Sequence, residues 1–366
     1  MGPAVILFVG PLPPPVHGFS FINAAMLARF QAVAPVAVFN RAPGGGISPR
    51  WTRFLLTLWR HRAGASLYIG LSGGWGQLKD WPYLLAARLM RCPVAVHHHS
   101  FAYLRRAPWY TRLVLGNTRR AQHLVLCDCM AAALAGGYGI ARHRIAVVSN
   151  AAFLDAAEGL PLPPPRGAAL RLGFLSNITA EKGIWAFFEL GDALVSSGVT
   201  VQALIAGPPA ADIAERFAKE TTARPWCSHV GAVYGAEKAR FFADIDVLVF
   251  PTLYANEAEP VTILEALRSG VPVVANARGC IGDMLPLAAG VVFEGDTQFV
   301  RQAAERLRAW ALERPAAGQA RRVAAREAFA MLQAEHSQRV DAIVAQLAGT
   351  TFSVAATGST AKSRPA

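Results

Sequence analysis

Residues 256–272 read Asn-Glu-Ala-Glu-Pro-Val-Thr-Ile-Leu-Glu-Ala-Leu-Arg-Ser-Gly-Val-Pro, and this stretch is the most informative part of the sequence. An apolar run, residues 247–250, precedes it, and a run rich in β-branched residues, 271–275, overlaps its end. Between the two runs, apolar residues recur at helical spacing, and Gly270 suits the position just after a helix. The stretch therefore predicts a strand, a loop, a helix and a second strand, which together form a βαβ unit.

This unit carries two carboxylates beside the start of a helix. Glu257 lies in the loop, Glu265 lies on the helix, and Pro260 suits the first turn, where its missing N–H costs nothing. The N-terminus of a helix offers free N–H groups and a positive dipole end to an anion, while carboxylates accept hydrogen bonds from hydroxyls. A nucleotide-sugar presents both a diphosphate and sugar hydroxyls. Two glutamates at this spacing also occur on ordinary surface helices, so the pair alone does not identify a site.

The whole string is more specific than the pair, because it also contains Glu-Ala-Leu and Ser-Gly-Val-Pro-Val-Val-Ala after an apolar strand. It resembles the donor-site motif of the retaining nucleotide-sugar glycosyltransferases of family 4. The resemblance implies an α/β fold with two Rossmann-like, doubly wound domains that face a cleft, the GT-B architecture. It implies that Glu257 faces the donor sugar, that Glu265 holds the ribose, and that Pro260, Val261 and Thr262 lie against the donor. It implies no cofactor and no metal, since the nucleotide-sugar is a co-substrate.

Further donor signals lie in residues 172–183, which end a strand and enter a helix. Lys182 can reach a phosphate as a point charge, and Gly183 lets the backbone come close. The family normally has an arginine five residues before this lysine, and here that position is Asn177. We therefore expect Lys182 to carry more of the phosphate charge, or a residue elsewhere to replace the arginine. Gly231 lies in a loop that the resemblance places against the nucleotide base.

Glu259 adds a third acidic residue to the loop before Pro260. Many members of the family have an apolar residue at this position. Two interpretations stay open: Glu259 selects a pattern of donor hydroxyls, or it faces solvent.

In the first half of the chain, His97-His98-His99 follow a short apolar strand. Neighbouring side chains on an extended backbone point alternately, so the three cannot all bind one ion, and we expect no metal site. By resemblance, His99 approaches the donor sugar and helps catalysis together with Glu257. The loop at residues 10–18 resembles the family's loop on the acceptor side of the cleft, which makes His17 and Gly18 candidate contacts there.

Apolar strands alternate with helical stretches along the chain, which favours βαβ units in doubly wound sheets. We expect a first domain at 1–165, a nucleotide-sugar domain at 166–325, a helix at 326–348 that crosses back to the first domain, and a disordered tail at 349–366. A proline-rich segment at 160–167 is the expected linker. The predicted strands are 5–9, 35–39, 66–69, 94–96, 124–127, 145–148, 170–175, 202–206, 228–230, 247–250, 271–275 and 290–293.

The net charge of +12 comes entirely from the first half. Residues 1–165 hold 16 Lys and Arg against 4 Asp and Glu, whereas residues 166–366 hold 20 of each kind. Segments 50–62 and 104–112 interleave arginines with Trp and Leu. Each suits either an amphipathic helix packed on a core or a membrane-surface element. The asymmetry favours an anionic membrane surface, and the chain contains no recognised nucleic-acid-binding motif.

The five cysteines lack paired zinc-type spacing, and we expect all of them to be reduced thiols in a cytoplasmic protein, peripheral on the inner face of the plasma membrane. No apolar run reaches the ~20 residues that span a bilayer. The expected activity is transfer of a sugar from a nucleotide-sugar to a lipid-linked or saccharide acceptor in assembly of a bacterial cell-surface polysaccharide or lipopolysaccharide. Two alternatives remain: a nucleotide-sugar 2-epimerase and a non-catalytic sugar-nucleotide-binding protein.

Overall fold

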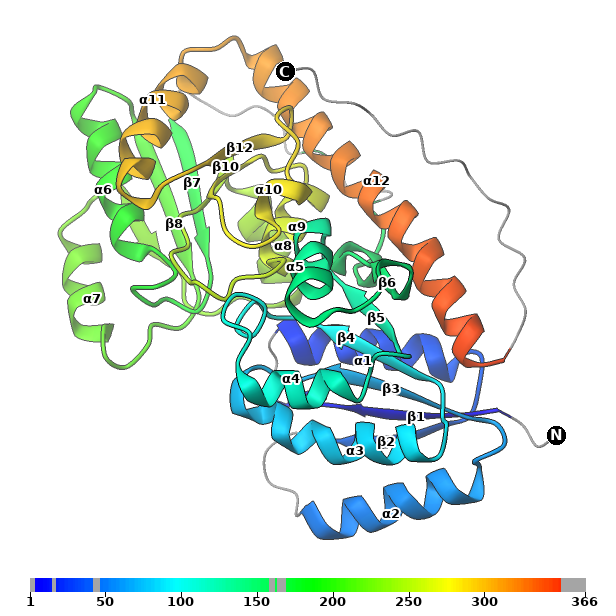
Figure 1. Ribbon diagram of the computed structural model, residues 1–366. Helices are drawn as coiled ribbons and strands as arrows, with labels where there is room; N and C mark the ends of the chain where they lie inside the picture. Colours follow the sequence, from blue (N-terminus) through cyan, green and yellow to red (C-terminus); the bar gives the residue numbers. More distant parts are fainter. Residues whose placement is uncertain (1–3, 15–17, 42–46, 158–161, 163–168, 350–366) are drawn as a thin grey trace.

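The computed structural model describes residues 4–14, 18–41, 47–157, 162 and 169–349, which form two α/β domains joined by a long C-terminal helix (Figure 1). Each domain contains one six-stranded sheet, and the described strand pairings are all parallel. Helices cover both faces of each sheet. The α/β fold with two doubly wound sheets that the sequence predicts is therefore confirmed.

The sheet of the first domain has the strand order β2-β1-β3-β4-β5-β6. Its strands are β1 (Val5–Gly10), β2 (Val36–Asn40), β3 (Ala65–Leu71), β4 (Val94–His98), β5 (Gln122–Val125) and β6 (Ile145–Val147). Its helices are α1 (Gly18–Gln31), α2 (Ile47–Arg60), α3 (Gln77–Leu89), α4 (Trp109–Gly116) and α5 (Asp128–Tyr138), with short 3-10 turns η1 (Gly74–Gly76), η2 (Arg142–Arg144) and η3 (Asn150–Phe153).

The sheet of the second domain has the order β12-β11-β10-β7-β8-β9. Its strands are β7 (Leu170–Leu175), β8 (Val201–Ala206), β9 (Cys227–His229), β10 (Val247–Phe250), β11 (Val273–Asn276) and β12 (Gly290–Phe293). Its helices are α6 (Ile184–Ser196), α7 (Ala214–Thr222), α8 (Gly235–Ala243), α9 (Val261–Arg268), α10 (Ile281–Met284) and α11 (Phe299–Ala311), with the turn η4 (Asp296–Gln298). In both sheets the strand order reverses beside the first strand, which is where open α/β sheets bind ligands.

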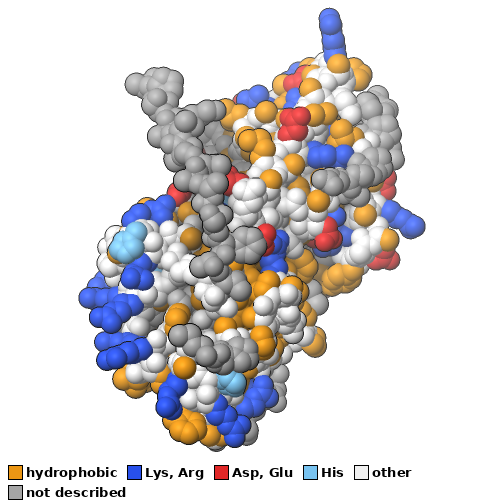
Figure 2. Space-filling model, turned by 90° about the vertical axis from the view of Figure 1, so that its right-hand side faces the viewer, with side chains coloured by type: hydrophobic (Ala, Val, Ile, Leu, Met, Phe, Trp, Pro, Cys, Tyr) orange, Lys and Arg blue, Asp and Glu red, His pale blue; other side chains and the backbone are white. Residues whose placement is uncertain are grey.

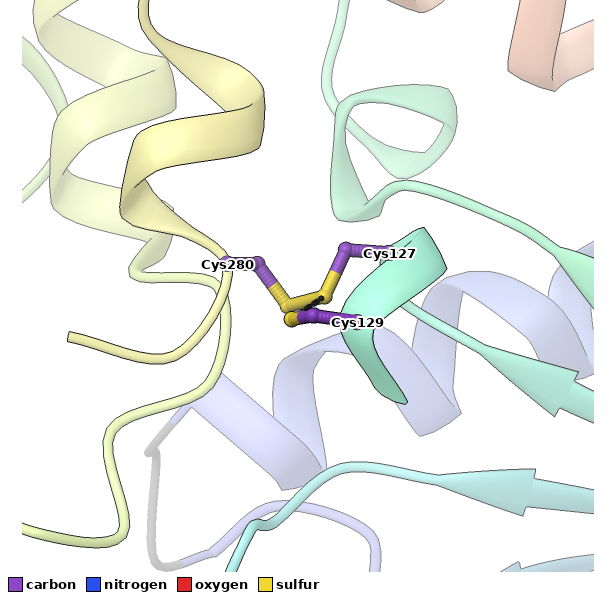
Figure 3. Close-up of side chains that lie close together, drawn as sticks. All are labelled: Cys127, Cys129 and Cys280. Carbon is purple, nitrogen blue, oxygen red and sulfur yellow. Dashed lines mark hydrogen bonds between the residues drawn. A yellow bond between two sulfur atoms is a disulfide. The ribbon is translucent and has the colours of Figure 1, made fainter. Parts of the chain in front are cut away.

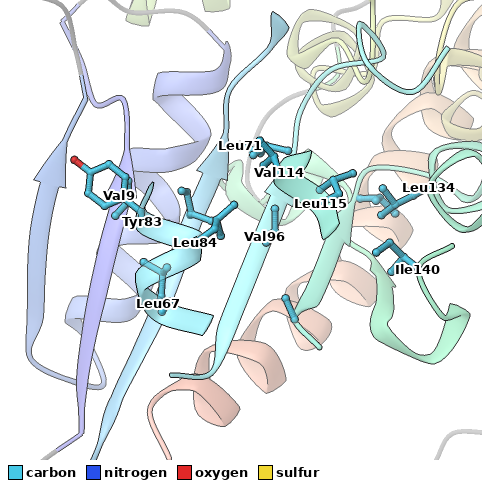
Figure 4. Packing of buried hydrophobic residues seen from close by; sticks show 14 of the residues in the cluster. Val9, Leu67, Leu71, Tyr83, Leu84, Val96, Val114, Leu115, Leu134 and Ile140 are labelled. Carbon is cyan, nitrogen blue, oxygen red and sulfur yellow. The ribbon is translucent and has the colours of Figure 1, made fainter. Parts of the chain in front are cut away.

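The apolar strands form because both of their faces are covered, so that no alternation with polar residues is needed. All six residues of β1 are buried. Figure 4 shows the packing on one face of the first sheet, where Leu67 and Val96 of the strands lie beneath Leu84 of α3. Each apolar run that the sequence predicts as a strand forms one. The bounds predicted at 170–175, 247–250 and 290–293 are those observed, and the other strands have ends shifted by one or two residues.

One shift has a clear cause at the end of α9. Gly270 has a φ of +69°, and the N–H of Val271 donates to the carbonyl of Ala266 at 2.8 Å. Val271 therefore closes the helix, and β11 begins only at Val273.

Helix α12 (Pro315–Leu347) runs along both domains (Figure 1). Its first half buries Phe329 in the core of the second domain, and Arg322 pairs with Asp246 at 2.7 Å beside β10. Its second half buries Val340 and Val344 among residues of the first domain. The helix has no break, so the boundary predicted at residue 326 falls inside it. The predicted linker, apart from Leu162, and the predicted tail beyond Gly349 lie outside the described residues.

The domains are also joined by sulfur. Cys127, just before α5, and Cys280, just before α10, form a disulfide with a Cα–Cα distance of 5.7 Å (Figure 3). The prediction that all five cysteines are reduced thiols is therefore wrong for this pair. The two positions are 153 residues apart and meet only because the domains pack together. Cys92, Cys129 and Cys227 are free thiols.

The surface charge follows the division into domains. In Figure 2, Lys and Arg side chains gather on the lower part of the visible face, which is the first domain, while Asp and Glu side chains lie mainly on the second. On α2, Phe54 and Leu58 are buried, and the ring of Trp51 stacks on Phe54 at 5.6 Å, so Trp51 belongs to the core. Trp59 and Trp109 are 57% and 64% exposed and remain at the surface. No helix in the described ranges is long and apolar enough to cross a membrane.

Candidate functional site

A cleft of about 700 Å³ lies between the domains, at the carboxyl ends of both sheets. The first domain lines it with Gly18, Phe19, Leu71, His99, Ser100 and Leu126, among others. The second domain contributes Asn177, Lys182, Lys238, Glu257, Thr262 and Glu265, among others. Most of the residues singled out in the sequence therefore meet in one cavity.

Glu257 is held in the loop after β10 by two groups. Lys182 Nζ lies 2.5 Å from Glu257 Oε2, and Thr252 Oγ1 donates to the same oxygen at 3.1 Å. The ammonium also lies 5.0 Å from the ring centroid of Tyr254, a favourable cation–π distance. Glu257 is 9% exposed and lines the cleft, and one of its carboxylate oxygens is already held by Lys182 and Thr252. Glu257 and Lys182 thus form one ion pair, although the sequence suggested separate partners for them.

The N-terminus of α9 opens onto the same cavity. Pro260 precedes the helix with extended backbone, and Val261 and Thr262 form its first turn at the wall of the cleft. The first N–H groups of a helix lack partners within the helix and carry the positive end of its dipole. This end of α9 can therefore accept an anion beside Lys182 and Glu257.

A second ion pair lies further along α9. Glu265 Oε1 is 2.7 Å from Lys238 Nζ, which comes from α8, and both side chains line the cleft. The sequence reasoning missed Lys238, because no motif surrounds it and its position depends on how α8 packs beside α9. The pair presents a carboxylate and an ammonium to a ligand, a combination that suits hydroxyls and phosphate oxygens.

Glu259 has a role that neither interpretation of the sequence anticipated. It is 6% exposed, and its two oxygens accept hydrogen bonds from Ser149 Oγ at 2.7 Å and from the N–H of Asn150 at 2.5 Å. The Nδ2 of Asn150 donates back to the Glu259 carbonyl at 3.0 Å. Glu259 does not face solvent; it ties the second domain to the end of the first. Burial raises its pKa from the usual 4.5 to about 7, although both hydrogen bonds oppose the rise.

The glycines and Asn177 lie in different places. Asn177 is exposed and lines the cleft. Gly183 has a φ of +86°, and a Cβ there would lie 2.0 Å from the Pro251 carbonyl oxygen. Glycine is therefore required at 183 by its backbone conformation and by the contact with Pro251. Gly231 accepts a hydrogen bond from the N–H of Gly207 at 2.7 Å, and the residues that follow it, 232–234, line the cleft.

The wall from the first domain presents His99. Its ring lies 4.7 Å from Phe19 and 4.0 Å from His97, and its Nε2 is buried with no hydrogen-bond partner in the described structure. Burial lowers the pKa of His99 to about 3, so its ring is neutral at physiological pH. Gly18, the first residue of α1, lines the cleft. His17 lies outside the described residues.

The other two histidines are buried and do not line the cleft. His97 Nδ1 lies 2.8 Å from the Tyr68 hydroxyl, and His98 bonds to Tyr103 at 2.9 Å and to His123 at 3.0 Å. Each of the two has partners of its own in the core of the first domain. The three consecutive histidines do not converge on one point.

Comparison with known proteins places this geometry in context. The family model for glycosyl transferases group 1 matches residues 169–309, and no curated protein matches the chain. The structure of HepE from Anabaena in complex with UDP is similar, with a TM-score of 0.70 and 15% identity over 93% of this chain and 99% of that one. A glycosyltransferase from Rickettsia africae has a TM-score of 0.68 at 11% identity over 94% and 99% of the two chains.

WaaG, a glycosyltransferase involved in lipopolysaccharide biosynthesis, has a TM-score of 0.63 at 16% identity over 93% of this chain and 99% of its own. At these identities the likeness shows the fold. The chain has the GT-B fold, and the family match over its second domain supports a GT-B glycosyltransferase.

Proposed function

We propose that this protein is a retaining glycosyltransferase of family 4 that transfers a sugar from a nucleotide-sugar to an acceptor. One observation carries the proposal: two Lys–Glu ion pairs and the N-terminus of α9 line a single cleft at the carboxyl ends of both sheets. HepE, which has the same fold, was solved with UDP and with UDP-glucose, so UDP-sugars are the first donors to test.

The donor diphosphate fits beside Lys182 and the first turn of α9. On binding, the Lys182 ammonium is shared between Glu257 and phosphate oxygens, which makes up for the uncharged Asn177. As the bond to the sugar breaks, negative charge grows on the departing phosphate, and these groups stabilise it. The ribose hydroxyls bind Glu265 beside Lys238, and the base lies against residues 232–234.

The sugar itself lies between the two walls of the cleft. Glu257 orients its hydroxyls, and neutral His99 offers a hydrogen bond from the opposite side without adding charge near the cationic sugar of the transition state. Closure of the domains excludes water, which otherwise competes with the acceptor. The new glycosidic bond forms on the face that the nucleotide leaves, so the configuration is retained.

The acceptor approaches from the first domain. We propose a lipid-linked or saccharide acceptor in assembly of a cell-surface polysaccharide or lipopolysaccharide, the process in which WaaG takes part. The basic first domain and its exposed Trp59 and Trp109 favour docking to an anionic membrane on the cytoplasmic side. Co-sedimentation with anionic vesicles that weakens with added salt tests this docking, because exposed charges are screened within about 8 Å at physiological ionic strength. Equal, negligible binding to anionic and neutral vesicles contradicts it.

The function is tested by incubating the full chain with a panel of nucleotide-sugars and with lipid-linked and free saccharide acceptors. The released nucleoside diphosphate is identified, and the anomeric configuration of the product is read by NMR. Release that depends on the acceptor, with a retained product, supports the proposal, and an inverted product contradicts the retaining assignment.

The same panel separates the two alternatives. A 2-epimerase changes the configuration of the sugar without needing an acceptor. A binding protein gives calorimetric binding of the nucleotide-sugar but no turnover with any acceptor.

A further inference from the structure

Three sulfur atoms meet where the domains touch (Figure 3). Cys127 and Cys280 are bonded to each other, and Cys129 Sγ lies 3.0 Å from Cys127 Sγ. All three atoms lie within 4.8 Å of one another. In the first domain, Cys127 directly precedes α5 and Cys129 lies in its first turn, whereas Cys280 precedes α10 in the second domain.

This sulfur cluster adjoins the cleft on both sides. In the second domain, the N–H of Cys280 donates to the Ala258 carbonyl at 2.9 Å, directly after Glu257. A Cβ on Gly279, whose φ is +52°, would lie 2.1 Å from the Glu257 carbonyl oxygen, so the two backbones are in close contact. In the first domain, Leu126 precedes Cys127 and lines the cleft. The disulfide therefore links the loop that carries Glu257 to the opposite wall.

The bonded sulfurs are shielded, but the third is accessible. Cys127 is 4% exposed and Cys280 is fully buried, so a thiol from solution cannot reach their bond directly. Cys129 is exposed and touches Cys127. A thiolate on Cys129 is thus the available nucleophile for the buried bond.

We propose that Cys127, Cys129 and Cys280 form a thiol–disulfide exchange site that locks or releases the two domains according to the thiol redox state around the protein. The idea that this site controls access to the cleft rests on the proposed function. The exchange chemistry of the three cysteines does not depend on that function. The Cys127–Cys280 bond holds the domains together. After reduction the domains remain connected by the backbone and by noncovalent contacts, such as the bonds of Glu259 to Ser149 and Asn150 and the packing of α12.

The release proceeds in two balanced steps. The Cys129 thiolate attacks Cys127 Sγ, a Cys127–Cys129 disulfide forms, and Cys280 leaves as a thiolate that takes up a proton. A dithiol from solution then reduces the Cys127–Cys129 bond and is itself oxidised to a disulfide. In the reverse direction, an oxidised low-molecular-weight disulfide such as oxidised glutathione accepts the two electrons as Cys127 and Cys280 join.

The surroundings of Cys129 make the exchange slow. Partial burial of the sulfur, together with the nearby Asp283 carboxylate, raises the pKa of the Cys129 thiol to about 11. Only a small fraction is thiolate at neutral pH, and the thiolate is the attacking form. The first step is therefore slow at neutral pH, and the released state accumulates only when a dithiol removes the Cys127–Cys129 disulfide.

The chemical experiment uses the full chain equilibrated with oxidised glutathione or with dithiothreitol. Under denaturing conditions, we expect three free thiols in the oxidised form and five in the reduced form, with peptide mapping that links Cys127 to Cys280. Cys129→Ser should slow reduction of the native protein by roughly tenfold, because the route through the exposed sulfur is lost. Cys227→Ser, at a free cysteine outside the cluster, is the matched control and should reduce at the wild-type rate.

Two results overturn the site. Five free thiols after oxidation show that no disulfide forms. One equivalent of zinc per purified chain, lost in Cys129→Ser, shows instead that three thiolates bind a metal.

A second experiment measures the distance between the domains and does not depend on activity. Donor and acceptor dyes, one on each domain of a chain that keeps the three cluster cysteines, report the spread of inter-domain distances. We expect this spread to narrow on oxidation and not to change in Cys280→Ser. An unchanged spread in the oxidised wild type contradicts the lock. A narrowed spread together with no sugar transfer in either redox state supports the lock and contradicts the proposed function.

Discussion

The two domains differ in where their charged side chains lie: on the outer surface of the first domain, and at the cleft in the second. The first domain carries all of the net charge of +12, yet none of its described residues that line the cleft is charged at neutral pH. The second half of the chain is neutral overall, yet it brings Lys182, Lys238, Glu257 and Glu265 to the cleft. Net charge thus describes the outer surface, which a membrane or acceptor meets. The ligand site depends on a few paired charges that cancel in the total.

The largest effect is expected when a charge is removed from the second-domain side of the cleft. Glu257→Gln keeps the size of the side chain but removes the charge that pairs with Lys182 at 2.5 Å. We expect turnover to fall by at least ~100-fold, because the sugar loses its orienting carboxylate in the transition state. Steady-state kinetics with the best donor measures the change. Glu305→Gln on α11, away from the cleft, is the control. Wild-type turnover in Glu257→Gln would show that Glu257 is not part of the site.

A smaller effect is expected on nucleotide binding to the second-domain side of the cleft. Lys182→Ala removes the ammonium beside the α9 N-terminus, and we expect the affinity for nucleoside diphosphate to fall roughly ten- to 100-fold. Asn177→Arg adds a positive charge at the cleft and should preserve or raise the affinity. Calorimetry with UDP measures both variants, and Lys219→Ala on α7 serves as control. An affinity unaffected by Lys182→Ala contradicts the phosphate role.

The contact between the walls gives a prediction with a defined sign. Glu259 has a pKa of about 7 in the folded protein against a usual value of 4.5, so the folded state binds its proton more tightly than the unfolded chain does. The stabilisation from this group is therefore present below about pH 4.5 and is lost as the pH rises to about 7. Glu259→Gln cannot titrate, so this contribution to the pH dependence disappears. It also loses one of two hydrogen bonds, which costs about 1–3 kcal/mol of the free energy of unfolding.

Denaturant unfolding of both proteins at several pH values measures the difference. If the wild type and Glu259→Gln show the same pH dependence, Glu259 does not titrate in this range. If the variant is as stable as the wild type above about pH 7, the bonds to Ser149 and Asn150 do not couple the domains.

No change with pH is expected on the first-domain side of the cleft, where His99 lies. Burial holds the pKa of His99 at about 3, so its ring should not gain a proton between about pH 5 and about pH 8. The ring resonances of His99, assigned by their loss in His99→Gln, should keep their positions across this range. A shift of these resonances with pH shows that the first-domain wall becomes charged.

Local sequence was sufficient for the strands and for the motif around Glu257. A continuous apolar run has one simple interpretation when helical stretches separate it from the next run, which is why β1, β7 and β10 were predicted. Glu257, Glu265 and α9 lie within one short stretch, so their relation does not depend on how the domains pack.

Other features depend on contacts between distant parts of the chain. Lys238 pairs with Glu265 across two helices, and Glu259 meets Ser149, 110 residues earlier in the sequence. The sequence leaves Trp51 either against a core or at a membrane surface, and its ring contact with Tyr83 of α3 at 5.2 Å shows that it packs against the core. Local sequence does not predict these contacts, because neither partner is marked by a motif in its own segment.

Helix α12 has a consequence for how the chain folds as the ribosome makes it. The core side chains Ile22, Met26 and Phe30 of α1 pack in the same cluster as Val340 and Val344, which are synthesised after the second domain. At about 5–20 residues per second, the first domain waits roughly 15 to 60 s between the two. During that time its apolar face stays bare while the second domain is being made. The N-terminal domain is therefore begun first, but its core is completed only after the second domain has been synthesised.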